Sequence, residues 1–353
     1  MKFEVMAVTA AVASRINSIV FPPLRFARLH LALRPQAPLF LPLEWRGNKL
    51  RGALGEILHA RECRPDCPGV AQCPHRAECA YAALFAPQIS ASDSAQAVLA
   101  SGRPLAGMSN IPRHFLLRPP LDSEPVFGPH RPLCFELRLF GAAMAAYRFF
   151  IETFAALEAY GFTAQRVPVR LESVWTLDQR SLPHTLLWQD GVAGDALPLP
   201  LALKQYPNHQ FRGHRLRIDY FTRTSIKHLG KTEQVPSLPG LVARLCDRLA
   251  ALCQWAEQKP WPADLVELKR LAHAGEIAEI RGGWELAERT STRTGETMDL
   301  SGFRGSVLYH HVAPELAPLL AWGQEIHAGR AAVWGNGWYR PHLPALDTFQ
   351  SNS

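Results

Sequence analysis

The sequence lacks any long uninterrupted hydrophobic run, and this absence sets aside several classes of protein. No segment has the unbroken apolar length that a membrane-spanning helix needs. The apolar stretch at residues 7–13 is short and follows Lys2 and Glu4 rather than the basic region of a secretory signal. A Rossmann glycine fingerprint and a helix-turn-helix pattern are also absent. We therefore expect a cytoplasmic protein without a membrane partner.

Positive charge is what the sequence has in excess. The chain has 353 residues, a formal net charge of +7, a sequence pI near 9.2 and a hydrophobic content of 47%. This length suits two domains that each bury their own core. The charge favours an anionic partner without naming one.

Four of the seven cysteines lie in one short segment. They are spaced C-x3-C-x5-C-x5-C, at Cys63, Cys67, Cys73 and Cys79. Four thiolates satisfy tetrahedral zinc and equally an iron-sulphur cluster, and reduced thiols or a disulphide pair are the alternative. We expect a structural zinc, with an iron-sulphur cluster as second choice, that holds an insertion at about residues 62–90 folded. Four sulphur ligands leave no open position for catalysis.

Hydrophobic periodicity predicts the same order of elements twice. Alternation predicts strands and helical spacing predicts helices. In the first half, strands are expected at 24–33, 114–118, 133–139 and 167–177, and helices at 43–61 and 147–160. In the second half, strands are expected at 214–224, 278–288, 302–311 and 331–340, and helices at 239–257 and 314–326. Residues 182–208 suit a hairpin or linker.

This order is the split βαβ arrangement of a ferredoxin-like domain. The sequence therefore predicts an α+β protein of two tandem ferredoxin-like (RRM-like) domains. We place them at 1–205, with the cysteine insertion, and at 206–353.

Three cations crowd the N-terminal turn of the first predicted helix, namely Arg46, Lys49 and Arg51. Cations at this end of a helix oppose its macrodipole, so an anion bound nearby explains them better than helix stability does. A solvated helix face is the alternative reading.

A glycine-rich stretch at residues 327–339 follows the last predicted helix. Its glycines, Gly329, Gly335 and Gly337, can take positive φ and allow another backbone to approach closely. Arg330 supplies charge, and three aromatic residues offer faces on which a base could stack: Trp334, Trp338 and Tyr339. An ordinary helix cap leading into a final strand is the alternative.

This stretch resembles the glycine-rich signature that closes the CRISPR repeat-processing endoribonucleases of the RAMP superfamily. The family pattern is His-x-Gly-Lys-Gly-x-x-Phe-Gly-x-Gly-x-Tyr. His327, Gly329, Gly335, Gly337 and Tyr339 match it. Three positions depart from it, with Arg330 in place of lysine, Ala331 in place of glycine and Trp334 in place of phenylalanine.

Other segments resemble the same family in the same order. Residues 50–55 are similar to its first-helix signature, and the cysteine cluster ends, as in many members, in Tyr-x-x-Leu-Phe at 81–85. Thr222, Thr224 and Lys227 match its Thr-x-Thr-x-x-Lys motif, and 302–305 match a Gly-x-x-Gly element. The chain is thus similar to a variant of the family with a four-cysteine insertion.

The resemblance implies metal-independent cleavage of CRISPR precursor RNA within each repeat. Attack of a ribose 2′-OH would give a 2′,3′-cyclic phosphate and mature crRNA. It implies repeat RNA as partner, with other Cas effector subunits as a further expectation. The catalytic candidates are His59 as base, Lys49 and Arg51 as cations and Tyr81 as their partner. His228 is the reserve histidine, whereas His327 is expected to shape the glycine turn.

The expected RNA-binding residues lie in the basic segments and the glycine-rich stretch. They are Arg46, Arg223, Lys227, His228, Lys231, Gly329, Arg330, Trp334, Gly335 and Gly337.

Two alternatives stay open. The same resemblance fits a non-catalytic RNA-binding subunit of an effector complex. A cysteine-ligated redox or DNA-binding module is a third reading, which predicts either iron-sulphur absorbance or zinc-dependent duplex binding.

Overall fold

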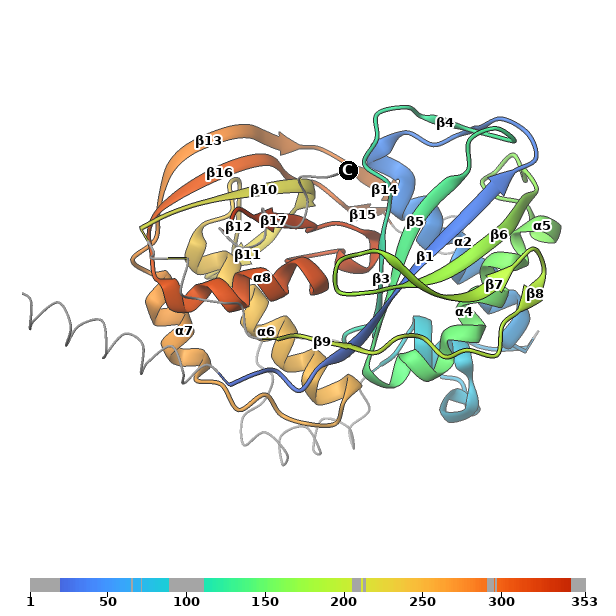
Figure 1. Ribbon diagram of the computed structural model, residues 1–353, viewed down its shortest axis with the longest axis horizontal. Helices are drawn as coiled ribbons and strands as arrows, with labels where there is room; N and C mark the ends of the chain where they lie inside the picture. Colours follow the sequence, from blue (N-terminus) through green and yellow to red (C-terminus); the bar gives the residue numbers. More distant parts are fainter. Residues whose placement is uncertain are drawn as a thin grey trace, which may run out of the picture.

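Two antiparallel sheets lie side by side, each with helices on one face (Figure 1). The computed structural model of the chain describes residues 20–64, 66–70, 72–88, 111–204, 211, 214–290, 295 and 297–343. Within these residues, every helix is too short or too polar to cross a bilayer.

The first sheet has the strand order β3-β5-β1-β6-β7-β8. Its strands are β1 (Arg25–Pro35), β3 (Phe115–Arg118), β5 (Leu133–Phe140), β6 (Val169–Leu177), β7 (Pro183–Gln189) and β8 (Val192–Ala193). Alternation in β1 directs Leu29, Leu31 and Leu33 into the core, where all three are fully buried. Opposite Leu29 in the register lies Leu137 of β5, so both strands present leucine to the same face.

Three helices accompany this sheet. They are α2 (Arg46–Glu62), α4 (Tyr147–Ala155) and α5 (Leu157–Tyr160). Leu50, Leu54 and Leu58 of α2 recur every fourth residue and are buried, so one helix face packs on the sheet. The β7–β8 hairpin was expected within 182–208, and it extends the sheet beyond β6.

The second sheet has the order β13-β16-β10-β17. Its strands are β10 (His214–Thr224), β13 (Glu276–Glu285), β16 (Gly302–Val312) and β17 (Tyr339–Pro341), and the helices of this half are α6 (Leu238–Ala256), α7 (Leu265–Ala272) and α8 (Ala317–Ile326). In both halves the four main strands, numbered by their place along the chain, lie in the order 2-3-1-4. The predicted α+β fold with two ferredoxin-like units is therefore confirmed.

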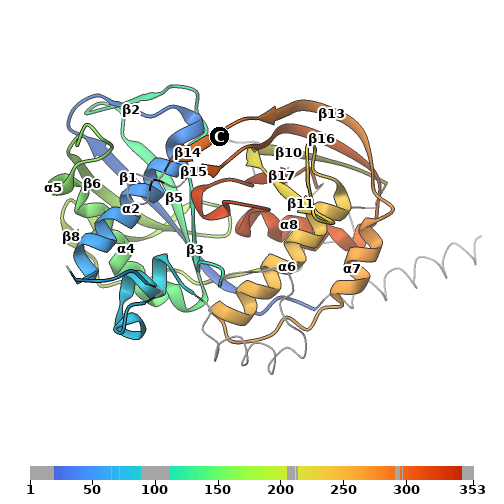
Figure 2. The same cartoon turned by 180° about the vertical axis from the view of Figure 1, so that it is seen from behind.

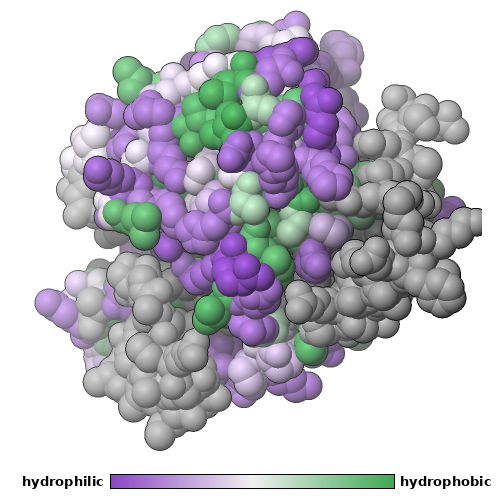
Figure 3. Space-filling view, turned by 90° about the vertical axis from the view of Figure 1, so that its left-hand side faces the viewer, coloured by the Kyte–Doolittle hydropathy of each residue, from purple (hydrophilic) through white to green (hydrophobic). Residues whose placement is uncertain are grey.

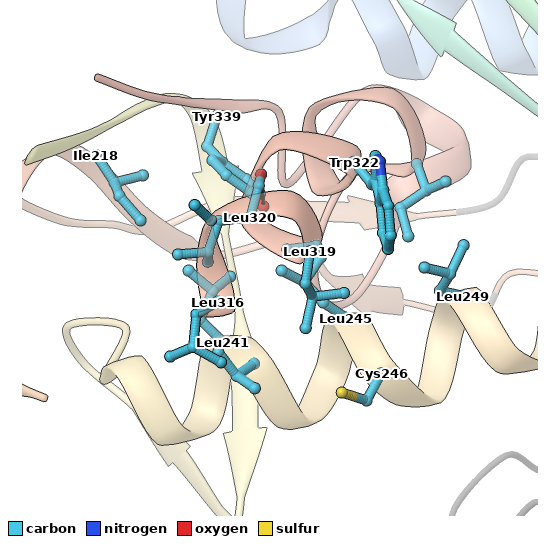
Figure 4. Close-up of a cluster of buried hydrophobic side chains, with 14 of the residues drawn as sticks. Ile218, Leu241, Leu245, Cys246, Leu249, Leu316, Leu319, Leu320, Trp322 and Tyr339 are labelled. Atoms are coloured by element: carbon cyan, nitrogen blue, oxygen red, sulfur yellow. Dashed lines mark hydrogen bonds between the residues drawn. The ribbon is translucent and has the colours of Figure 1, made fainter. Parts of the chain in front are cut away.

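The core of the second half lies between α6, α8 and the sheet (Figure 4). Leu241, Leu245 and Leu249 recur along α6 with helical spacing and face leucines of the α8 segment. Tyr339 of β17 closes this core and donates its hydroxyl to the carbonyl of Leu320 at 2.8 Å.

Four short pairings complete the fold. They are β2 (Leu39–Phe40) with β4 (Val126–Phe127), β11 (Ile226–His228) with β12 (Lys231–Glu233), β14 (Glu288–Thr290) with β15 (Thr297–Asp299), and β9 (Leu201–Ala202) with β1. The end of the molecule seen in Figure 3 is mostly hydrophilic, with hydrophobic residues in small separate patches.

A buried ionic network joins the two halves. The Glu325 carboxylate, near the end of α8, forms ion pairs with the guanidinium groups of Arg28 in β1 at 2.6 Å and Arg138 in β5 at 2.7 Å. Arg138 also pairs with Glu136 at 3.1 Å, and Arg118 of β3 lies 3.6 Å from the same carboxylate. Three arginines and two glutamates thus fix the end of α8 against the first sheet (Figure 1).

Candidate nucleic-acid interface

The glycine-rich stretch forms a compact turn rather than the strand expected at 331–340. Only Tyr339–Pro341 pair with β10, and a single 3-10 turn, Ala332–Trp334, precedes them. The prediction of a strand from residue 331 is wrong because positive φ values at Ala331 (57°), Gly335 (83°) and Gly337 (71°) interrupt any extended chain. His327 itself ends α8 with φ 57°.

Backbone contacts hold this turn closed against β10. The Ala328 amide donates to the Gly337 carbonyl at 2.9 Å, and the Gly337 amide donates to the Arg223 carbonyl at 3.0 Å. Thr222 donates its hydroxyl to the Gly335 carbonyl at 2.8 Å. A Cβ at Gly337 would lie 1.8 Å from the Ala328 oxygen, so this position admits only glycine.

Helix α2 docks its first turn on the glycine turn. A Cβ on Gly47 would lie 1.9 Å from the carbonyl oxygen of Trp334. Further along α2, a Cβ on Gly55 would lie 2.2 Å from the Phe85 ring, whereas Gly52 has nothing within 4 Å. Figure 2 shows α2 along the first sheet, with one end beside β14 and β15 of the second half. At this point, the seam between the halves includes a close contact with the main chain of the glycine turn.

We predict opposite stability effects for two glycine-to-alanine changes in this one helix. Gly47→Ala should lower the free energy of unfolding by about 1–3 kcal/mol, because the new methyl group meets a main-chain oxygen. Gly52→Ala should raise it by up to about 1 kcal/mol, because alanine is the better helix former and the position is open. Urea unfolding of both variants measures the difference, and equal effects would contradict the docking of α2 on the turn.

Arg46 does not face a ligand, so its place among the expected RNA-binding residues is not supported. It is fully buried, and its guanidinium donates to the main-chain carbonyls of Leu41, Pro120, Asp122 and Glu124 at 2.6–3.0 Å. The cation therefore ties a loop to α2, which explains its position at this helix end without an anion.

Lys49 and Arg51 lie on different sides of α2. The Lys49 side chain is exposed, whereas Arg51 is 9% exposed. The Arg51 guanidinium lies between two rings, 4.4 Å from the centroid of Phe85 and 4.7 Å from that of Trp334. Burial, together with the charges of Arg113 and Arg289, lowers the pKa of Arg51 to about 9.

The three aromatic residues of the turn do not offer free faces to bases, which corrects the stacking role expected for them. Trp334 is 7% exposed, with guanidinium groups of Arg51 and Arg289 at 4.7 Å and 5.1 Å from its ring centroid. Tyr339 is fully buried. Trp338 has the Arg118 guanidinium 4.2 Å from its ring centroid and stacks on the His327 ring at 6.2 Å. These rings pack the seam instead.

The structure brings His59 and Tyr81 together. Their ring centroids are 5.0 Å apart at an interplanar angle of 87°. Arg51, Gly55 and His59 recur every fourth residue, so they share one face of α2, and this face packs on the π-helical turn Tyr81–Phe85. His59 is only partly buried, so a ligand can reach it. His59 thus lies on the same face as the buried Arg51, eight residues further along α2, in reach of a ligand for acid-base chemistry.

A groove runs along the seam between α2, β10 and the glycine turn. Its lining includes Asn48, Thr222, Arg223, Arg304, Trp334 and Asn336. It continues into a more open hollow of about 390 Å³ over the outer face of β10 and β16, with Phe221, Arg281, Arg304 and Ser306 in its lining. Arg223 is 7% exposed and donates to the Glu44 carbonyl. The cationic surface of the groove therefore comes mainly from Arg281, which no motif marked, and from Arg304, which lies within the Gly-x-x-Gly element at 302–305.

The other expected RNA-binding residues are solvent-facing or backbone elements. Lys227 and Lys231 are exposed and His228 is partly buried on the β11–β12 hairpin, and none of them lines the groove. The Arg330 guanidinium is about half exposed and lies 3.9 Å from Asp299. Gly329 and Gly335 have φ values of 77° and 83°, so they shape the turn.

The cysteines lie in the segment after α2, and all four are partly buried. Burial and the neighbouring thiols of Cys79 and Cys67 raise the pKa of Cys63 to about 12. Three thiols are thus close together, which suits thiolate ligands of a cation. Across the described part of the chain, however, no group of three or more His, Cys, Asp or Glu side chains is arranged to hold a metal.

Two family models match the chain. One, described as CRISPR-associated endoribonuclease Cas6, matches residues 218–339, which hold the second sheet and the glycine turn. The other, described as an N-terminal domain, matches residues 24–199. The second half of the chain is therefore similar to the Cas6 family.

No curated protein matches the chain in sequence. A solved structure of Thermus thermophilus Cas6 is 15% identical, with 90% of this chain and 98% of that chain covered and a TM-score of 0.47. A partial Cas6-RT-Cas1–Cas2 complex is 13% identical, with 92% of this chain and 47% of that chain covered and a TM-score of 0.52. The second likeness supports a shared Cas6 fold.

His327 of the Cas6 glycine signature is a structural residue. It is fully buried, and its Nδ1 lies 3.1 Å from the Asn336 carbonyl, which only accepts, so Nδ1 carries the proton. Burial and the charges of Arg118, Arg138 and Arg248 lower its pKa well below the usual 6.5. A histidine that is fully buried and so weakly basic is a poor proton acceptor and is closed to a substrate.

Buried neutral histidines predict that acid destabilises the protein. Burial also lowers the pKa of His114 from 6.5 to about 4. Below pH 6.5 both side chains bind protons in the unfolded protein but not in the folded one. Their contribution to the free energy of unfolding is therefore fully present above pH 6.5 and is lost as the pH falls. For His114 the loss between pH 6.5 and 4 amounts to about 3 kcal/mol at most. Urea unfolding at several pH values measures it. His114→Gln should flatten the profile, the exposed His130→Gln should not, and a flat wild-type profile would contradict the prediction.

Proposed function

We propose that this chain is an endoribonuclease that processes CRISPR precursor RNA, cleaving within each repeat without a metal. The Cas6 match over residues 218–339 supports RNA cleavage as the activity class. The observation that carries the proposed site is the pairing of His59 with Tyr81 on the α2 face that also presents Arg51. We also retain the cytoplasmic location inferred from the sequence.

In the proposed reaction the 2′-OH of the ribose attacks the adjacent phosphorus. His59 takes the 2′ proton as general base, since histidine titrates near neutrality. The new bond joins O2′ to phosphorus, and the bond from phosphorus to O5′ breaks. Tyr81 is the proposed donor of the proton that the leaving 5′ oxygen takes up. The products are a 2′,3′-cyclic phosphate and a 5′-hydroxyl.

Arg51 is the proposed source of stabilisation for the phosphorane charge. A fixed guanidinium in a dry setting stabilises developing negative charge more than it would in water. Lys49 faces solvent on another side of α2, so we assign it a contact with the RNA backbone rather than with the reacting phosphate.

The proposed RNA path follows the seam groove past Arg223, Arg281 and Arg304 toward the glycine turn. Arg330 and the exposed β11–β12 hairpin with Lys227, His228 and Lys231 offer further phosphate contacts. The solved structures that are similar to this chain include Cas6 in a product complex and in a substrate mimic complex. Repeat RNA is therefore the proposed ligand of this chain, and other Cas proteins are proposed partners.

Cleavage of a labelled repeat RNA in EDTA tests the proposal. We expect cleavage at one position within the repeat, with the rate unchanged by the chelator, and no cleavage of a scrambled RNA. A non-catalytic RNA-binding subunit would bind the repeat without cutting it, and that outcome would replace the enzyme by the alternative. Activity that disappears with EDTA would overturn the metal-independent mechanism.

We further propose that Cys63, Cys67, Cys73 and Cys79 hold a structural zinc. The proximity of the Cys63 thiol to those of Cys67 and Cys79 supports thiolate ligands. The zinc would fold the segment that ends in Tyr81 and so set the position of this residue against His59.

Metal analysis tests the zinc site. We predict one zinc per chain, lost in Cys63→Ser together with a lower melting temperature, and kept in Cys134→Ser outside the cluster. Visible absorbance with bound iron would support the iron-sulphur alternative. A metal-free protein whose melting temperature resists chelators would contradict both.

A further inference from the structure

Two arginines from distant parts of the chain lie over the ring of Trp334, and a third, Arg113, lies near one of them. Arg51 comes from α2, Arg113 from the segment before β3, and Arg289 from β14 of the second half. Arg51 and Arg289 lie 4.7 Å and 5.1 Å from the Trp334 ring centroid. Arg113 donates its Nε to the Phe85 carbonyl at 2.6 Å, on the same turn that carries the ring under Arg51.

We name Arg51, Arg113 and Arg289 the Trp334 arginine cluster. No ion pair joins any of the three to a carboxylate in the described residues. The Nε of Arg51 is buried and has no hydrogen-bond partner there. A buried, charged donor without a partner is destabilising by several kcal/mol unless something satisfies it.

The ionic network on the other side of the seam shows the contrast. Arg28, Arg118 and Arg138 are equally crowded, but Glu136 and Glu325 lie among them. Buried charges are normally paired, and within the described residues no carboxylate pairs with the Trp334 arginine cluster. The Trp334 arginine cluster therefore has the composition of an anion site.

We propose that the Trp334 arginine cluster binds a phosphodiester of the RNA, with Arg113 and Arg289 as phosphate ligands beside Arg51. Arg113 and Arg289 are only partly buried, so an anion can reach them from solvent. The Arg51 Nε is buried and, within the described residues, free to donate to that anion. Tyr81 stacks on the Phe85 ring at 5.2 Å between centroids, and Arg51 lies over the same ring, so the anion would lie near the His59–Tyr81 pair. The site forms only when both halves are docked, because Arg289 comes from the second.

This inference rests on the proposed function, since it names where that enzyme holds its substrate. It assigns to Arg113 and Arg289 a positioning role on phosphate. A planar guanidinium group donates two parallel hydrogen bonds to phosphate oxygens, whereas lysine supplies only a charge. A lysine at either position should therefore restore only part of the phosphate affinity.

The first test uses inorganic phosphate and thermal unfolding at constant ionic strength. Phosphate should raise the melting temperature of the wild type, because a ligand of the folded state stabilises it. In Arg289→Gln the rise should disappear, while the melting temperature without phosphate should stay equal or increase. Arg270→Gln removes an exposed arginine of α7 and should keep the full response. A wild type that phosphate does not stabilise, or an Arg289→Gln that responds normally, would overturn the site.

The second test uses repeat RNA. Arg289→Gln should weaken RNA binding about tenfold or more, as expected for a lost charge-assisted hydrogen bond. It should also reduce the slope of log affinity against log salt by about 0.7 if the contacted segment is single-stranded. Arg289→Lys should recover the slope but only part of the affinity. Unchanged affinity and slope in Arg289→Gln would contradict the proposal.

The two tests separate this inference from the proposed function. If the wild type cleaves repeat RNA but Arg289→Gln shows normal phosphate response and RNA binding, the site fails and the enzyme stands. If phosphate stabilises the wild type and not Arg289→Gln while no repeat RNA is cleaved, the site stands and the proposed nuclease fails.

Discussion

His59→Ala is expected to slow cleavage of repeat RNA by about 10²–10⁴-fold, the usual contribution of a general base. RNA affinity should stay close to that of the wild type, because the phosphate contacts lie on other side chains. The physical reason is geometric, since His59 is held edge-on against Tyr81 and remains open to solvent. Single-turnover cleavage with a separate binding assay measures both quantities.

His228→Ala is the matched control for this prediction. His228 lies on the β11–β12 hairpin, outside the seam groove, so its removal should leave the rate of the chemical step nearly unchanged. If the His228 variant lost cleavage and the His59 variant kept it, the roles would be reversed. Cleavage that persists in His59→Ala would reject this residue as the base and leave the activity itself intact.

Glu325→Ala is expected to lower the free energy of unfolding by about 3–5 kcal/mol, because it leaves buried arginines without their counter-ion. Although burial opposes its ionisation, Arg138, Arg28 and Arg118 hold the pKa of Glu325 at about 2. The Arg28 and Arg138 side chains are only 11% and 1% exposed, so water cannot replace the carboxylate. Urea or guanidinium unfolding gives the difference.

Glu56→Ala provides the comparison on the surface. Glu56 pairs with Arg166, and both side chains are 56% exposed, so the expected loss is below about 1 kcal/mol. Acid should destabilise the wild type as Glu325→Ala does. The ionised Glu325 carboxylate stabilises the folded protein above pH 4.5, and this stabilisation is lost as the pH falls toward 2. Equal effects of Glu325→Ala and Glu56→Ala would show that the network does not join the halves.

The order of strands and helices was predictable because the spacing of hydrophobic residues differs between a strand and a helix. The alternation of Leu29, Leu31 and Leu33 in β1, and the spacing of Leu241, Leu245 and Leu249 in α6, follow directly from burial on one face. The glycines that match the family signature were also informative, since Gly335 and Gly337 adopt positive φ in the turn.

The surroundings of single side chains were not predictable in this way. Arg46 looks like an anion ligand in the sequence, but the loop at 120–124 folds over it and occupies its donors. Trp334 looks like a stacking platform, but Arg289, 45 residues before it, covers it together with Arg51. Such partners come from distant segments, and no spacing rule along the chain reports them.

Arg113 and Arg289 carry no sequence signal of their own. Each is an isolated arginine outside the recognised motifs, and only the fold brings both near Arg51. Arg281 in the groove likewise lies outside the motifs. Sequence therefore predicted the architecture and the His59–Tyr81 region, whereas the cationic surroundings required the fold.

We propose that this chain cuts repeat RNA by attack of a ribose hydroxyl. The most direct measurement compares, in EDTA, a repeat RNA with the same RNA carrying one 2′-deoxy nucleotide immediately 5′ of the cleaved bond. The account predicts that both bind equally, that the unmodified RNA is cut to a 2′,3′-cyclic phosphate, and that the deoxy RNA stays intact. Cleavage of the deoxy RNA at the same bond would contradict it.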